Sequence, residues 1–242
     1  MSDYSEIDAR CDLAAAHRLA VMYALNEGTW NHMSLEHPTN PDLTLISPGY
    51  THWSQVCAGN LALTTRDGEF ISGGRPPINA AAVIHHPVHQ ARPDIQCLIH
   101  VHTPHITALG MQKGMKLDCC GSQQAAQFHD DIAYYEVYDG VLIDPIEGAR
   151  MCDALGDKRI LMLRNHGVIV SGTSVAQAFL DLYQLERACQ YQLLATAGGA
   201  RLQQIPVENC AEMCRMAREG KSDPHFAAMR RLLDEQEPNY VD

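Results

Sequence analysis

The sequence predicts a single α/β domain, and three observations lead to this prediction. Segments with strand-like and helix-like patterns alternate along the chain. No repeat, linker or low-complexity tract divides them. The 242 residues are 46% hydrophobic, which is enough apolar material for one well-buried core. We therefore expect one domain over residues 1–242, with its core at about residues 8–200 and a helical tail over residues 201–242.

Apolar residues at helical spacing predict helices, and short apolar runs between turn residues predict strands. The expected helices cover residues 8–26, 79–91, 105–111, 145–155 and 175–197, with shorter helical pieces after residue 207. The expected strands cover residues 43–47, 61–65, 69–72, 95–101, 132–138, 159–163 and 168–170. Asp67-Gly68 favours a hairpin between the second and third of these strands, whereas Pro87 should kink its helix or split it into shorter pieces.

The acidic character of the chain argues against several classes of partner. A net charge of −11 repels phosphate backbones and anionic lipid, so neither nucleic acid nor a membrane is expected as a partner. The N-terminal residues lack the basic and apolar regions of a secretory signal, and no apolar run approaches the ~20 residues that span a bilayer. The nine cysteines are scattered and odd in number, which favours reduced thiols. We therefore expect a cytoplasmic protein that acts on a small molecule.

Three of the thirteen histidines stand in a pattern that suits a metal ion. His100 and His102 lie two residues apart at the end of an expected strand, so their side chains point to the same face. His166 lies in a turn after another strand, directly before Gly167. Three imidazoles with an open position describe a catalytic zinc site, and Fe(II), Mn(II) or Co(II) would fit as well. Ordinary packing remains the alternative, because a His-x-His pair on a strand is common.

Taken together, these segments resemble the class II aldolase/adducin family. The run from His100 to Pro104 matches the family's metal-binding His-x-His, and the run from Leu163 to Val168 matches its third-histidine segment. Gly28 to Ser34 is similar to its early glycine/asparagine loop, and Val175 to Ala197 to its last long helix. The resemblance extends over about residues 13–200. It implies a three-layer α/β/α fold with a central, mainly antiparallel sheet, a divalent metal, and a homotetramer with the active site near a subunit boundary.

The chain also departs from the sugar-phosphate aldolases of that family. Those enzymes carry a Ser-Ser-Glu stretch that grips phosphate and supplies a metal ligand and base; the matching positions here are Asn79, Ala80 and Ala81. Alanine can neither ligate a metal nor accept a proton. Asn31-His32 likewise replaces the Gly-Asn pair of the early loop. These changes argue against a sugar-phosphate aldolase of the standard type.

Other residues must then supply the acid and base. The candidate bases are His32 and His85, although His85 shares a helix face with His89, and packing or orientation of a neighbour is the simpler interpretation. The candidate acid is Tyr135, with Tyr134 and Tyr138 as alternatives. The expected substrate contacts come from residues of the early loop, of the Ser-Ser-Glu position and of a later polar pair: Asn31, Ser34, Asn79 and Gln124, with Gln123 beside it.

The function that these residues favour is a metal-dependent lyase. Stabilisation of an enolate suits retro-aldol cleavage or decarboxylation of a small, oxygenated, non-phosphorylated hydroxy or oxo acid. Two alternatives stay open: a mononuclear non-heme iron oxygenase on the same scaffold, and a non-catalytic, adducin-like interaction module. The presence of all three histidines, the acidic surface and the lack of a basic tail favour an enzyme over the interaction module.

Overall fold

The computed structural model describes residues 4–114, 116–138, 140, 145–220 and 223–242. In this part of the chain, strands form one sheet in the order β4-β3-β2-β1-β5-β8-β7-β6. The strands are β1 (His32–Glu36), β2 (Leu43–Ile46), β3 (Ala62–Thr65), β4 (Phe70–Ser72), β5 (Cys97–Val101), β6 (Ile132–Tyr135), β7 (Ile160–Leu163) and β8 (Gly167–Gly172). The helices are α1 (Glu6–Met22), α2 (Asn79–Ala91), α3 (Pro104–Gly110), α4 (Gln123–Ala126), α5 (Pro145–Leu155), α6 (Val175–Thr196), α7 (Val207–Glu219) and α8 (Asp223–Gln236). Short 3-10 turns are η1 (Trp53–Gln55), η2 (Ala58–Asn60) and η3 (Pro238–Val241).

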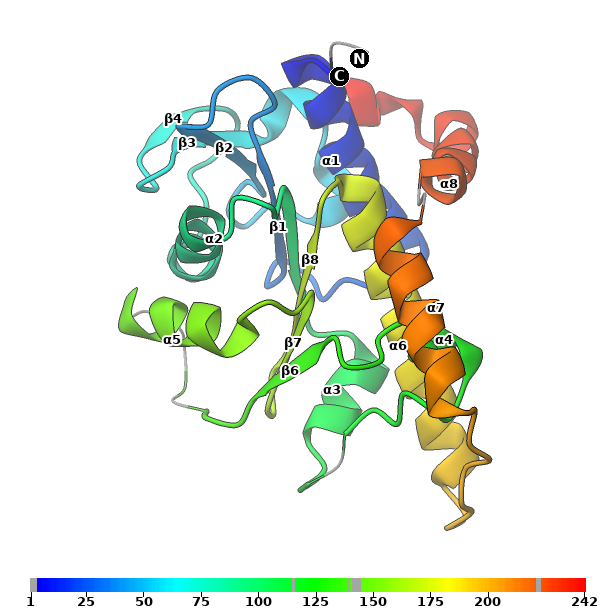
Figure 1. The fold of residues 1–242 in the computed structure, drawn as a ribbon. Helices are drawn as coiled ribbons and strands as arrows, with labels where there is room; N and C mark the ends of the chain where they lie inside the picture. Colours follow the sequence, from blue (N-terminus) through cyan, green and yellow to red (C-terminus); the bar gives the residue numbers. More distant parts are fainter. Residues whose placement is uncertain (1–3, 115, 139, 141–144, 221–222) are drawn as a thin grey trace.

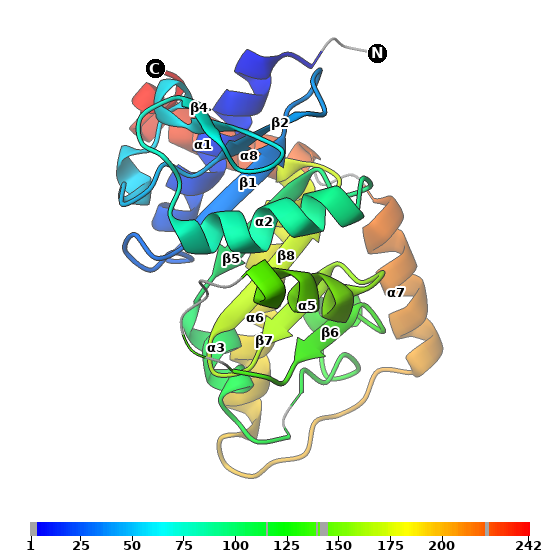
Figure 2. The same ribbon diagram turned by 90° about the vertical axis from the view of Figure 1, so that its left-hand side faces the viewer.

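The sheet lies between two layers of helices, as Figures 1 and 2 show. Helices α2 and α5 cover one face, while α1, α3 and α6 pack against the other. Every strand pair is antiparallel except β6 with β7. The α/β class and the mainly antiparallel three-layer arrangement are therefore confirmed. No described helix has both the length and the apolar character needed to cross a bilayer.

Alternation along β5 divides its side chains between the two layers. Cys97, Ile99 and Val101 join the larger core, on the side of α1 and α6. Leu98 joins a second core cluster beneath α2 and α5. Because residues two apart share a face, His100 projects on the same side as Leu98, toward α2. The strand thus buries a histidine next to an apolar cluster.

Strand β1 is the element that the sequence did not predict, because Gly28 to Ser34 was expected to be a loop. Polar residues at His32, Ser34 and Glu36 alternate with Met33 and Leu35, which is a strand pattern with a polar face. Met33 and Leu35 enter the larger core. His32 and Ser34 are nevertheless buried, since histidines of α2 supply hydrogen bonds to this face.

Pro87 does not split α2, which runs unbroken over Asn79–Ala91. Proline has no N–H for the carbonyl of Val83, four residues before it. That carbonyl is instead covered by α5, where an added Cβ at Gly148 would lie 2.0 Å from the Val83 oxygen. Helix α5 crosses α2 at this point and packs closely against it, so α5 covers the carbonyl that the proline leaves without its helical donor.

The C-terminal residues complete the main core. Phe226, Met229, Leu233 and Tyr240 are buried and belong to the larger apolar cluster, with the Phe226 ring 5.8 Å from the ring of Phe179. Helix α8 contacts both α1 and α6. The core therefore extends past the expected limit near residue 200.

The fold should lose stability as the pH falls through the histidine range. Burial lowers the pKa of His17 from 6.5 to about 4, while its Nδ1–H donates to the Leu13 carbonyl at 2.7 Å. Between these two values the unfolded chain binds a proton that the folded chain does not, so the free energy of unfolding decreases as pH falls. Each such histidine contributes a slope of about 1.4 kcal/mol per pH unit.

The measurement is urea unfolding across this window for the parent chain and for His17→Gln, whose amide does not titrate. The slope of stability against pH should be shallower in His17→Gln by about 1.4 kcal/mol per pH unit. Equal slopes in the two proteins would contradict the assignment of this acid sensitivity to His17.

Candidate metal centre

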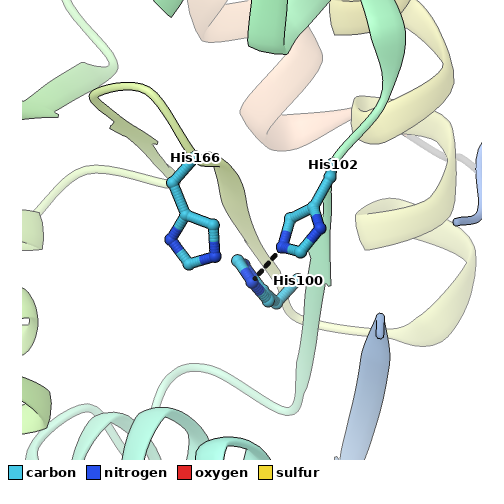
Figure 3. Close-up of side chains that lie close together, drawn as sticks. All are labelled: His100, His102 and His166. Carbon is cyan, nitrogen blue, oxygen red and sulfur yellow. Dashed lines mark hydrogen bonds between the residues drawn. The ribbon is translucent and has the colours of Figure 1, made fainter. Parts of the chain in front are cut away.

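The three candidate ligands come together at one end of the sheet (Figure 3). His100 lies in β5, His102 follows directly after it, and His166 lies in the turn between β7 and β8. Asn165 adopts φ 53°, a left-handed conformation that tightens this turn. Strands β5 and β8 are paired, so the turn is carried to the end of β5 where the other two histidines lie.

One nitrogen from each ring can reach a common point. The three potential ligand atoms all lie within 4.8 Å of one another. The ring centroids are 4.9 Å apart for His100 with His102 and with His166, and 4.7 Å apart for His102 with His166. The Nε2 atoms of His100 and His102 are 3.0 Å apart. This is close to the separation of about 3.3 Å expected for two nitrogens bound tetrahedrally at about 2.0–2.1 Å.

In His100 and His102, a hydrogen bond from Nδ1 determines that Nε2 is the nitrogen free to bind a metal. The Nδ1–H of His100 donates to the Val168 carbonyl at 3.0 Å, and the Nδ1–H of His102 donates to Glu27 Oε2 at 2.7 Å. In the neutral rings, both Nε2 atoms therefore carry lone pairs. Two lone pairs that face each other at 3.0 Å repel unless a proton or a cation lies between them. With His166 as third donor, a divalent cation would satisfy all three rings.

The surroundings keep two of these rings uncharged. Burial holds the pKa of His100 well below its usual value, and the neighbouring imidazoles His32, His166 and His102 lower it further. Burial also lowers the pKa of His166 to about 4, with the nearby His102 adding to the effect. Neutral imidazole is the form that binds a metal, so no proton needs to be displaced from these rings near neutral pH.

Gly167 allows the His166 turn to lie against β5. An added Cβ at Gly167 would lie 2.3 Å from the Val101 carbonyl oxygen and 2.9 Å from the Cδ2 atom of His102. Real Cβ contacts are never this short, so any side chain would push the turn away. The position of His166 thus depends on the absence of a side chain at the next residue.

A pocket opens over the three histidines. It is lined by aromatic and aliphatic groups together with imidazoles and an amide: Trp30, His32, Tyr50, Ile78, Asn79, Ala80, Ile84, His100, His102, Tyr138, Gly140 and His166. Three nitrogen donors that face such a pocket fit a catalytic metal, which keeps an open position for substrate. The donor set suits zinc, Fe(II), Mn(II) or Co(II) rather than magnesium or calcium, which prefer oxygen.

Two of the other expected site residues reach this pocket. His32 lies opposite His100 in the β1–β5 pair, with the two ring centroids 4.8 Å apart. Asn79, the first residue of α2, lines the pocket from above the sheet. His85 is fully buried and contacts His32 from behind, with Nε2 at 2.6 Å from His32 Nδ1.

The remaining expected residues are placed elsewhere. Ser34 is fully buried. Its hydroxyl forms hydrogen bonds with His85 and His89 and does not face the pocket where a substrate would bind. Asn31 is buried and accepts a hydrogen bond from the Glu27 backbone. Gln124 lies on α4, in a groove against α6 and α7. Tyr135 ends β6 within the core beneath α2 and α5, and it is Tyr138 that lines the pocket.

Glu27, Trp30 and Tyr50 also belong to the site, although the sequence did not predict them. Glu27 bonds His102 from 75 positions away along the chain, and such a pairing gives no local signal. Trp30 and Tyr50 are 64% and 70% exposed, so they lie at the mouth of the pocket rather than in the core. Their exposure and their closeness to the potential ligands are properties of the fold, so no pattern in the sequence indicated them.

Comparisons with known proteins agree on one family. Residues 11–193 match the family model described as Class II Aldolase and Adducin N-terminal domain. The chain is 32% identical, over 98% of its length, to a Pseudomonas aeruginosa protein named "Putative aldolase class 2 protein", and the match covers 93% of that protein. It is 34% identical to the alpha-adducin of Mus musculus over 81% of this chain, but that match covers only 27% of the adducin.

Solved structures give the same result. The crystal structure of an aldolase II superfamily protein from Pseudomonas syringae superposes with a TM-score of 0.89 at 33% identity, and the match covers 98% of this chain and 96% of that one. An L-fuculose 1-phosphate aldolase from Glaciozyma antarctica gives a TM-score of 0.83 at 24% identity, with coverage of 96% and 92%. The likeness to the Glaciozyma antarctica enzyme, at 24% identity, shows a shared fold and nothing further.

Removing the charge on Glu27 should weaken metal binding without removing a ligand. In Glu27→Gln the amide oxygen can still accept from His102, but it no longer raises the basicity of that ring. We expect the Zn(II) affinity, measured by competition with a chromogenic chelator, to fall about 10- to 100-fold. The control is Glu212→Gln on α7, a comparably exposed glutamate that bonds Arg215 and should leave the affinity unchanged. Equal affinity in parent and Glu27→Gln would contradict this role.

A side chain at Gly167 should weaken metal binding although all three histidines remain. Gly167→Ala would force the turn away from Val101, so His166 would no longer reach the common point. We expect a loss of at least about 10-fold in Zn(II) affinity, comparable with the loss of a group that orients a ligand. Gly198→Ala, where an added Cβ meets nothing within 4 Å, should bind as the parent does. If Gly167→Ala also binds as the parent does, the close approach does not govern the site.

Proposed function

The chain belongs to the class II aldolase and adducin N-terminal domain family, and we propose that within this family it is a metal-dependent lyase. The proposed reaction is retro-aldol cleavage of a small, non-phosphorylated hydroxy acid or hydroxycarbonyl compound, with decarboxylation of a related acid as the alternative. Zinc is the proposed metal, with Fe(II), Mn(II) and Co(II) as substitutes. The proposed ligands are His100, His102 and His166. A homotetramer that acts in the cytoplasm stays a prediction.

The observation that carries this proposal is the pair of facing Nε2 atoms of His100 and His102. Their Nδ1–H bonds to Val168 and Glu27 leave a lone pair on each, 3.0 Å apart, at the floor of a pocket. A structural zinc site would be closed by a fourth protein ligand, whereas this group holds three among the described residues. Three donors below a pocket favour catalysis.

The pocket lining supports a substrate without a phosphate group. Among the described residues that line it, none is a lysine or an arginine. Asn79 and Ala80 stand where the sugar-phosphate aldolases carry phosphate-binding serines, and Ala81, at the glutamate position, is buried. Trp30, Tyr50 and Tyr138 give the mouth an aromatic wall instead, which favours a substrate with an apolar part.

The bound metal would act as a Lewis acid that stabilises the negative charge of an enolate. His32 would take the proton of the substrate hydroxyl at its free Nε2. The carbon–carbon bond then breaks, the alkoxide oxygen becomes a carbonyl, and the bonding electrons stay on the other fragment as an enolate. Tyr138, which lines the pocket, would return a proton to that fragment, rather than Tyr135. The Asn79 amide would orient a substrate oxygen.

A second candidate is an adducin-like interaction module without catalysis. The observation in its favour is the 34% identity with alpha-adducin, which is as high as that with the aldolase-type relative. An interaction module does not need a metal-ready site. Retention of the three ligands, with a carboxylate that orients one of them, therefore favours the lyase.

The test is a screen of hydroxy and oxo acids with the Zn(II)-loaded chain, followed by chelation and metal return. We expect turnover that chelation abolishes and Zn(II) restores. His32→Gln should retain the metal but lose kcat by about 10²- to 10⁴-fold, the usual contribution of a general base. His225→Gln, at an exposed histidine of α8 outside the site, is the control and should keep full activity. Undiminished turnover by a metal-free His100→Ala protein would reject the lyase.

A further inference from the structure

We infer that a buried chain of hydrogen bonds, which starts at the Ile95 carbonyl, fixes His32 in the tautomer whose unprotonated Nε2 opens into the pocket. The chain passes through His89, Ser34 and His85, which are positioning residues rather than catalytic ones. The catalytic meaning of this arrangement rests on the proposed function. The tautomer itself does not, and it can be tested in the metal-free protein.

This series of hydrogen bonds alternates between α2 and β1 and ends on β1, in four contacts. His89 Nδ1 lies 3.3 Å from the Ile95 carbonyl oxygen. His89 Nε2 lies 2.7 Å from the Ser34 hydroxyl, and the same hydroxyl lies 2.5 Å from His85 Nδ1. His85 Nε2 lies 2.6 Å from His32 Nδ1. Each ring therefore uses both nitrogens, except His32.

The Ile95 carbonyl, at the start of this series, sets the donor-to-acceptor direction of every hydrogen bond in it. A backbone carbonyl can only accept, so His89 Nδ1 must carry the hydrogen. The Glu36 carboxylate, 3.3 Å from the same nitrogen, also favours a hydrogen there. In a neutral ring, His89 Nε2 is then an acceptor, and the Ser34 hydroxyl must donate to it.

The remaining assignments follow one after another. Because the single hydroxyl hydrogen of Ser34 is used, its oxygen accepts from His85, and His85 Nδ1 carries the hydrogen. His85 Nε2 is then an acceptor, so His32 Nδ1 must donate to it. His32 Nε2 is left with a lone pair. Among the described residues it has no hydrogen-bond partner, although the His32 side chain is only 2% exposed and lines the pocket.

These assignments hold for neutral rings, and burial provides them. Burial lowers the pKa of His89 to about 3 and holds the pKa of His85 well below the usual value. The His32 ring is buried and forms no ion pair with a carboxylate among the described residues. No water needs to be invoked, since the four members are all buried and the bonds between them are direct. An arrangement with reversed polarity would leave the Ile95 carbonyl facing a lone pair.

The lone pair of His32 selects what can bind beside the metal. It accepts a hydrogen bond, so it attracts a hydroxyl and repels a carboxylate or ether oxygen. His32 is outside the group of three ligand atoms that lie within 4.8 Å of one another, so it would stand beside a bound metal and would not ligate it. We therefore infer that the substrate presents a hydroxyl to His32. This favours retro-aldol cleavage over decarboxylation of an acid that has only carbonyl oxygens.

The first test is the histidine ¹⁵N NMR spectrum of the metal-free protein, in which protonated and unprotonated ring nitrogens have well-separated shifts. His32, His85 and His89 should each show Nδ1–H and unprotonated Nε2, with assignments from single His→Gln variants. An Nε2–H tautomer at any of the three, in the otherwise folded parent protein, overturns the inference. This outcome would leave the proposed lyase standing, because metal content and turnover are measured separately.

The second test breaks the chain at Ser34. Ser34→Ala removes the hydroxyl that bridges the rings of His85 and His89, so His32 should change from one tautomer to a mixture while the Zn(II) affinity stays within about two-fold of the parent. Ser34→Thr keeps the hydroxyl and should restore the single tautomer. The control is Ser171→Ala on β8, an equally buried strand serine whose hydroxyl donates to the Arg159 carbonyl. An unchanged His32 tautomer in folded Ser34→Ala overturns the inference, and if that variant does not fold, the parent spectrum decides.

Discussion

The candidate site depends on the pairing of β5 between β1 and β8. This register sets His32 opposite His100 on one side and carries the β7–β8 turn to the end of β5 on the other. Because side chains alternate along a strand, the same register keeps Ile99 and Val101 in the larger core. A shift of one residue would exchange these two sets of side chains. The apolar core therefore fixes the direction in which the histidines point.

Burial of so many histidines has two consequences that support each other. Burial removes water from the rings and keeps them neutral, which leaves each ring with one donor and one acceptor. A buried donor or acceptor without a partner costs about 1–3 kcal/mol, so most ring nitrogens are fixed by a specific contact. The two nitrogens of His100 and His102 that face each other lack such a contact, and a shared cation would supply it. His32 Nε2 also lacks one and opens into the pocket, and both ring nitrogens of His86 are buried without a partner among the described residues.

Much of the fold could be predicted from local pattern. The hairpin at Asp67-Gly68, the strand that bears His100 and the long helix after residue 174 all have periods and turn residues that the structure bears out. The spacing of His100 and His102 and the turn at His166 likewise predicted that three rings could converge. Strand β1 was missed because its alternate residues are polar, and partners that lie far along the chain decide that they are buried.

The rest of the site depends on contacts between distant residues. Nothing near Glu27 in the sequence indicates that it bonds His102, and nothing near Ser34 indicates that its hydroxyl joins two histidines of α2 instead of a substrate. Pro87 was expected to break α2, but the effect of a proline depends on what covers the carbonyl it leaves free, which here is α5 at Gly148.

X-ray absorption at the metal edge of the Zn(II)-loaded protein tests the convergence of the three imidazoles most directly. The structure predicts three histidine nitrogens at about 2.0–2.1 Å, with the outer-shell scattering of imidazole rings and no sulfur neighbour. A sulfur shell at about 2.3 Å would place the metal at the cysteines, and fewer than three imidazoles would show that the rings do not share one ion. Either result would contradict the site on which the proposed chemistry depends.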